Sequence, residues 1–155
     1  MTNSIYNSII NKINAYAAKR HITVTLSNRF AYDAQDQEVF LNAKCKNKIK
    51  YIIYYLHELG HAVQQDSYFH KLKYKTNNIK KSIILEQEYT AWVNGYHIAH
   101  ALDIIDVFMK EYLIEWVSAW RTYFEFIHKF NSKQLHNMFT GYIAENRPPS
   151  LRPLI

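Results

Sequence analysis

The chain has 155 residues, 48% of them hydrophobic and 21% charged, with a formal net charge of +6 at pH 7. This length supports one domain with a buried core, and only 3 Gly and 3 Pro favour a mostly helical structure over a loop-rich β-sandwich. Cys45 is the single cysteine, which excludes an internal disulfide. The sequence shows no signal peptide, and charged residues interrupt its most apolar region, so we expect a cytoplasmic protein without a membrane span.

The first third of the chain predicts one helix followed by a small sheet. Apolar residues recur at helical spacing from Ile5 to Ala17, behind Ser4 as the expected cap. Three short segments then have the alternating or β-branched character of strands: 21–27, 29–32 and 38–42. A polar turn at 33–37 separates the last two of them.

The remaining two thirds predict helices and a terminal tail. Helices are expected at 46–65, 83–101, 103–130 and 132–145, with a polar, basic loop at 66–82. A Pro-rich tail is expected at 147–155. One helical face carries aromatic and apolar residues that predict core packing: Trp116, Trp120, Tyr123, Phe124 and Ile127. The whole pattern predicts a single α+β domain over residues 1–146.

The helix at 46–65 carries the sequence His57-Glu58-Leu59-Gly60-His61, which fits the H-E-x-x-H pattern of zinc-dependent hydrolases. Residues four apart lie on the same face of a helix, so His57 and His61 can converge on one ion. Glu58 lies beside them and can accept a proton from water without being a ligand. Because this helix is apolar around most of its circumference, buried ionisable groups there need compensation, which a zinc ion supplies.

A site of this kind needs a third protein ligand and one open position for water. Glu86 and Glu88 lie about 200° apart on a helix, so only one of them can face the metal. Counting three, seven and eleven residues on from Glu88 reaches Ala91, Gly95 and Ala99, a stripe of small residues that permits close helix packing. We therefore expect Glu88 to be the third zinc ligand, with Glu86 as the alternative.

The segments 57–62 and 88–95 resemble the ImmA/IrrE-type metallopeptidases, which have relatives encoded by phages and other mobile elements. In that family an E-x-x-A helix follows the H-E-x-x-H helix. The resemblance covers residues 20–100. It implies a zincin-like fold, a Zn²⁺ cofactor held by His57, His61 and Glu88, and Glu58 as the catalytic base. It also implies a peptide substrate lying along an edge strand, for which the segment 38–42 is our candidate.

The predicted function is a zinc-dependent endopeptidase that hydrolyses one specific intracellular protein. The alternatives are a zinc-containing module that binds protein or nucleic acid without cleaving it, and a domain whose metal is only structural. Five lysines in the loop between the two site helices could contact phosphate or attract an acidic substrate: Lys71, Lys73, Lys75, Lys80 and Lys81. An intact Glu58 favours the peptidase, because neither alternative needs a proton acceptor beside the metal.

Overall fold

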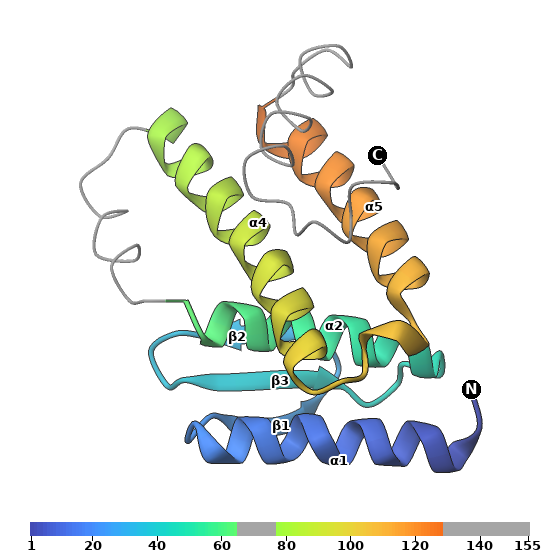
Figure 1. Cartoon of the computed structure of the whole chain (residues 1–155). Coiled ribbons are helices and arrows are strands. Elements are labelled where there is room, and N and C mark those ends of the chain that lie inside the picture. The colour runs from blue at the N-terminus through green and yellow to red at the C-terminus, as the bar shows by residue number, and fades with distance from the viewer. Residues whose placement is uncertain (65–76, 129–155) are drawn as a thin grey trace.

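A computed structural model shows an α+β fold with a small mixed sheet and packed helices, which confirms the predicted class (Figure 1). The structure describes residues 1–64 and 77–128, and within the second range the side chains of 86–122. The elements in chain order are α1 (Asn3–Lys19), β1 (Thr23–Ser27), β2 (Ala31–Asp33), β3 (Glu38–Asn42), α2 (Lys48–Ala62), α4 (Asn77–Ala101), the 3-10 helix η1 (Ile105–Val107) and α5 (Met109–His128). The tail at 147–155 and the helix expected at 132–145 lie outside the described residues.

The first helix begins two residues earlier than expected, because Thr2 rather than Ser4 is its cap. The Thr2 hydroxyl accepts the backbone N–H of Ile5 at 3.3 Å. At the other end, His21 adopts the left-handed conformation with φ 57°, which turns the chain and delays the first strand until Thr23. The β3 strand has the predicted bounds, whereas the β2 strand is displaced by up to two residues along the chain.

The strand order is β1-β3-β2, so β3 is the central strand and our assignment of residues 38–42 to the substrate-binding edge was wrong. The β3 strand pairs in parallel with β1 and antiparallel with β2. Val39 and Leu41 are 0% and 3% exposed, so these alternate residues of β3 face the core. The order of the strands along the chain did not predict their order in the sheet, because the last strand inserts between the first two.

The helices after the sheet carry the candidate site. The α2 helix is capped by Asn47, whose side-chain oxygen accepts the N–H of Lys50 at 3.0 Å. The α4 helix begins at Asn77. Our prediction of a loop at 66–82 was therefore wrong for residues 77–82. Polar and basic residues obscure the helical period at 77–82, although lysine itself is a good helix former. No helix in the described ranges is long and apolar enough to cross a membrane.

Two glycines let α2 and α4 pack backbone against backbone. A Cβ on Gly60 would lie 2.0 Å from the carbonyl oxygen of Ala91, and a Cβ on Gly95 would lie 2.7 Å from that of Leu56. Ala91 and Gly95, two of the three small residues counted from Glu88, therefore lie at the predicted close contact, and the third, Ala99, is fully buried. This packing holds the two site helices together.

The α5 helix packs against α4 and α2. Trp116 and Trp120 are buried, at 4% and 1% exposed, as their helical spacing predicted. Both pack on Tyr89, with ring centroids 5.7 and 5.0 Å away. The side chains of Tyr123, Phe124 and Ile127 fall outside the described residues, so that part of the expected face stays a prediction.

Candidate metal centre

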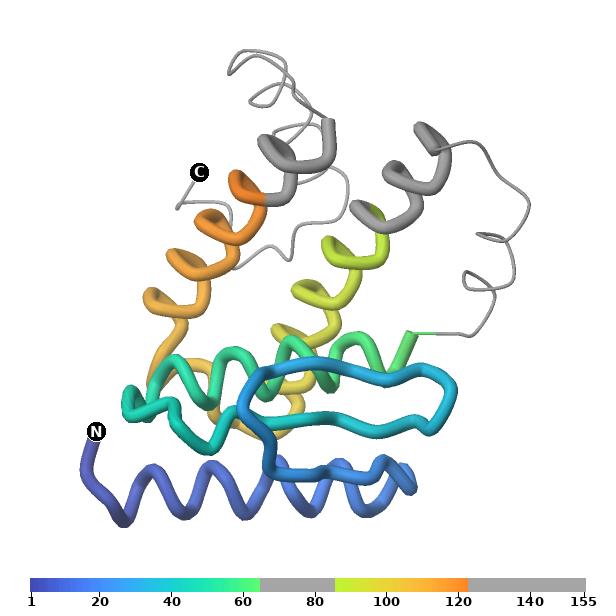
Figure 2. Tube along the Cα trace, turned by 180° about the vertical axis from the view of Figure 1, so that it is seen from behind, coloured from blue at the N-terminus to red at the C-terminus, as the bar shows by residue number. Residues whose placement is uncertain are grey.

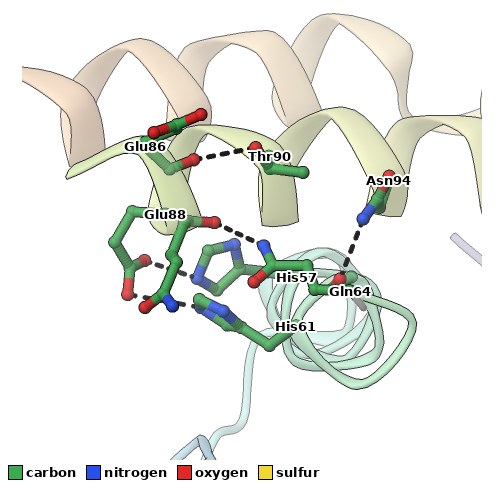
Figure 3. A network of polar contacts seen from close by, with 9 residues as sticks. His57, His61, Gln64, Glu86, Glu88, Thr90 and Asn94 are labelled. Atoms are coloured by element: carbon green, nitrogen blue, oxygen red, sulfur yellow. Dashed lines mark hydrogen bonds and ion pairs between the residues drawn. The ribbon is translucent and has the colours of Figure 1, made fainter. Parts of the chain in front are cut away.

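Three predicted ligand side chains meet where α2 crosses α4. His57 and His61 project from α2 toward Glu88 on α4 (Figure 3). His57 Nε2 lies 3.1 Å from Glu88 Oε2, and His61 Nε2 lies 3.3 Å from Glu88 Oε1. One potential ligand atom from each residue falls within 4.8 Å of the other two, so the cluster is able to hold a metal ion.

The spacing of the polar atoms in this cluster is compatible with a shared cation. Ligands of a tetrahedral zinc ion are separated by about 3.4 Å, given zinc–ligand distances near 2.1 Å. The two measured contacts, 3.1 and 3.3 Å, come close to that separation. Within the described residues, Glu88 Oε2 is buried with no partner in hydrogen-bonding geometry. Two imidazoles and one carboxylate are also the donor set of several catalytic zinc sites.

Burial and mutual contact set the protonation of these groups. Burial lowers the pKa of His57 against the opposing influence of Glu88. Burial also lowers the pKa of His61. The neighbouring carboxylates of Glu88 and Glu58 raise this pKa by more, so that it is raised overall. Burial raises the pKa of Glu88, but contacts with both histidines lower it by more, so that this pKa lies well below the usual range. An ionised Glu88 beside a neutral His57 is a protonation state suited to a cation.

Glu58 is buried on α2, with 7% of its surface exposed. Burial raises the pKa of its carboxyl to about 7, and Glu88 acts in the same direction while His61 opposes it. Glu58 follows His57 directly on α2 and lies three residues before His61. A cation bound by the cluster would favour the ionised form of Glu58, because opposite charges stabilise one another.

Aromatic residues from two elements, α4 and β2, pack against the two imidazoles. Trp92 of α4 packs on His57, with ring centroids 4.4 Å apart. Tyr32 of β2 lies parallel to the His61 ring, with centroids 6.5 Å apart and planes inclined by 3°. Sequence reasoning missed the role of Tyr32, since nothing in a three-residue strand indicates which helix residue it will face.

A hydrogen bond also connects α2 to α4 beside the candidate metal site. The amide nitrogen of Asn94 donates to the carbonyl oxygen of Gly60 at 3.1 Å, and Figure 3 shows this bond beside the cluster. The bond connects α4 to α2 one residue before His61. It therefore reinforces the close packing at Gly60. This packing fixes the position of Glu88 relative to the two histidines.

Glu86, the alternative ligand, points away from the cluster (Figure 3). Its side chain is exposed, and its backbone carbonyl accepts the hydroxyl of Thr90 at 2.8 Å. The structure therefore brings Glu88, and not Glu86, to the two histidines. The lysines expected to form a basic loop lie outside the residues whose side chains are described: Lys71, Lys73, Lys75, Lys80 and Lys81.

Comparisons with protein-family models, with curated proteins and with solved structures each gave no match to this chain. The fold and the site therefore define only a broad class of protein. The chain is an α+β protein with a candidate His-His-Glu metal site between two packed helices.

Proposed function

We propose that this protein is a zinc-dependent endopeptidase of the zincin type, related to the ImmA/IrrE metallopeptidases, acting on an intracellular protein. The observation that carries the proposal is the meeting of His57, His61 and Glu88 with Glu58 buried beside them. A purely structural zinc site has four protein ligands. Among the described residues this cluster has three, which leaves one position for water.

The chemistry assigned to the chain's own residues follows from their places. A zinc ion held there would lower the pKa of a water molecule and polarise the scissile carbonyl. Glu58 would act as the general base, taking a proton from an attacking water and passing it to the leaving amine. His57, His61 and Glu88 would hold the ion, and the packing of Trp92 and Tyr32 would keep the imidazoles oriented.

The edge strand beside the site is β2, and this strand is our revised candidate for peptide binding. β2 occupies one edge of the sheet, and its Tyr32 stacks on His61. An extended peptide that pairs with this edge would pass beside the histidines. Replacing Tyr32 with alanine should raise the KM for peptide cleavage, measured at saturating zinc because Tyr32 also orients His61. An unchanged KM would remove β2 from the substrate site.

The test measures bound zinc and peptide cleavage in matched carboxylate variants. Cleavage is read by mass spectrometry on a mixed library of unstructured peptides, because the natural substrate is not identified. Glu58→Gln should keep its zinc and lose turnover by at least about a hundredfold, the usual contribution of a general base. Glu88→Gln should lose zinc affinity, whereas Glu86→Gln, its exposed neighbour two residues earlier, should keep it.

Two results would count against this assignment. Equal cleavage by Glu58→Gln and the unmodified protein would refute the mechanism. Tight zinc binding without cleavage of any library peptide would favour the alternative, a zinc-containing module that binds a protein or nucleic acid.

A further inference from the structure

A second feature lies away from the metal cluster, where residues of α1, β1, β3 and α2 line a groove of about 430 Å³. Figure 2 shows α1 running alongside the first strand in this part of the molecule. Its lining is mostly apolar and includes Ile10, Ala18, Val24, Leu26, Leu41 and Tyr51. Leu26 at the rim is 68% exposed, the largest value among the large hydrophobic residues described. Such a groove has room for one or two apolar side chains.

The groove also contains one polar pair. The hydroxyl of Tyr55, a fully buried residue of α2, donates to Asn14 Oδ1 at 2.8 Å. Because this bond engages the oxygen of Asn14, the amide nitrogen is the group that can donate to an incoming carbonyl. The lining therefore suits a peptide segment, which presents both apolar side chains and backbone carbonyls.

The part of the chain around this groove is strongly basic. The first 57 positions contain three acidic residues: Asp33 at the end of β2, Asp36 in the turn, and Glu38 at the start of β3, where it pairs with Thr23 of β1. The same 57 positions contain these cations: Lys12, Lys19, Arg20, Arg29, Lys44, Lys46, Lys48 and Lys50. This segment thus carries +5 of the formal net charge of +6.

The cations stand at both ends of the strand that borders the groove. Lys19 and Arg20 close α1 just before β1 begins. At the far end of β1, Ser27 accepts the N–H of Ala43 at 2.9 Å, which places Lys44 beside that end. An apolar groove with cations at each end attracts a ligand whose apolar part is flanked by negative charge.

We propose that this groove docks an acidic segment of a partner protein, with an apolar side chain in the groove and carboxylates near Arg20 and Lys44. The chain's own C-terminal tail is a poor occupant, because residues 147–155 contain two arginines and no acidic residue. The proposal does not depend on hydrolysis at the metal cluster. It adds a docking surface formed by different residues.

The test uses the full chain and fluorescence polarisation of a labelled peptide in which leucine alternates with glutamate. A peptide with lysine in place of glutamate is the charge control. The protein carries Glu58→Gln, so that the probe is not cleaved and failure of the peptidase proposal leaves this measurement unaffected. The glutamate peptide should bind and the lysine peptide should not.

Two pairs of variants locate the binding. Ala18→Trp fills the groove from an exposed helix position and should weaken binding at least about tenfold, the contribution of one buried aliphatic side chain. Ala15→Trp, also exposed on α1 but outside the groove lining, should bind within about twofold of the parent. Lys44→Glu should weaken binding about threefold to tenfold, whereas Lys110→Glu on α5 should not.

Several outcomes would overturn the docking proposal. Equal binding of the two tryptophan variants would place the peptide elsewhere. A second contrary result would be full competition by an oligonucleotide of the same charge, together with unchanged peptide binding by Ala18→Trp. This result would show that the protein attracts anions in general. A dimer that only Ala18→Trp dissociates would make a second copy of this chain the occupant.

Discussion

Replacing Gly60 with alanine tests how closely the site depends on helix packing. In an isolated helix this change would stabilise the protein by about 1 kcal/mol. Here the new Cβ would lie 2.0 Å from the carbonyl oxygen of Ala91 and 2.8 Å from its carbonyl carbon. These atoms belong to the backbone and cannot rotate away, so the helices must separate. Overpacking of this kind costs about 3 kcal/mol, which leaves a net loss of about 2 kcal/mol.

The expected loss lowers Tm by about 4–8 °C in a chain of this size. It should be measured by urea and thermal unfolding in the presence of a chelator, so that metal binding does not contribute. Zinc affinity should fall by about tenfold or more in the same variant, because Ala91 lies one turn from Glu88 and a displaced helix moves that ligand. A chromogenic chelator competing for zinc provides that measurement.

Ala15→Gly, at an exposed position of α1, measures how much a change in helix propensity alone alters the free energy of unfolding of this protein. It should destabilise by about 1 kcal/mol, since nothing but helix propensity changes. If Gly60→Ala instead proves more stable than the unmodified protein, with zinc affinity unchanged, the close contact between α2 and α4 does not exist in solution.

Three further effects follow from particular contacts. Asn47→Ala removes the cap of α2 and should cost about 1 kcal/mol in urea unfolding; an unchanged midpoint would contradict the cap. Tyr54→Phe removes the 3.0 Å hydrogen bond to Glu115 and should cost about 1 kcal/mol, a small loss because Glu115 keeps its 3.2 Å ion pair with Lys50. Zinc at about 100 times its Kd should raise the free energy of unfolding by about 2.7 kcal/mol, an increase that Glu88→Gln should largely abolish. Equal stabilisation of that variant would remove Glu88 from the site.

Local periodicity was enough to predict the parts of the site that lie within one helix. His57 and His61 are four residues apart, and any helix through them places both on one face. The bounds of β3 also followed from the sequence, because alternation of apolar and polar residues is a property of the strand itself. Small residues spaced from Glu88 correctly indicated which carboxylate faces α2, since only that stripe allows the close approach seen at Gly60.

The relations between segments needed the tertiary structure. Alternation says which face of a strand is buried but not which strand lies beside it, so the central place of β3 could not be read from chain order. The stacking of Tyr32 on His61 and the groove beside β1 likewise depend on contacts between residues far apart in the chain. The sequence by itself indicated which residues could form the candidate metal site, because the helix period is local. Only the folded chain decided which of them meet, because packing between elements is a property of the whole core.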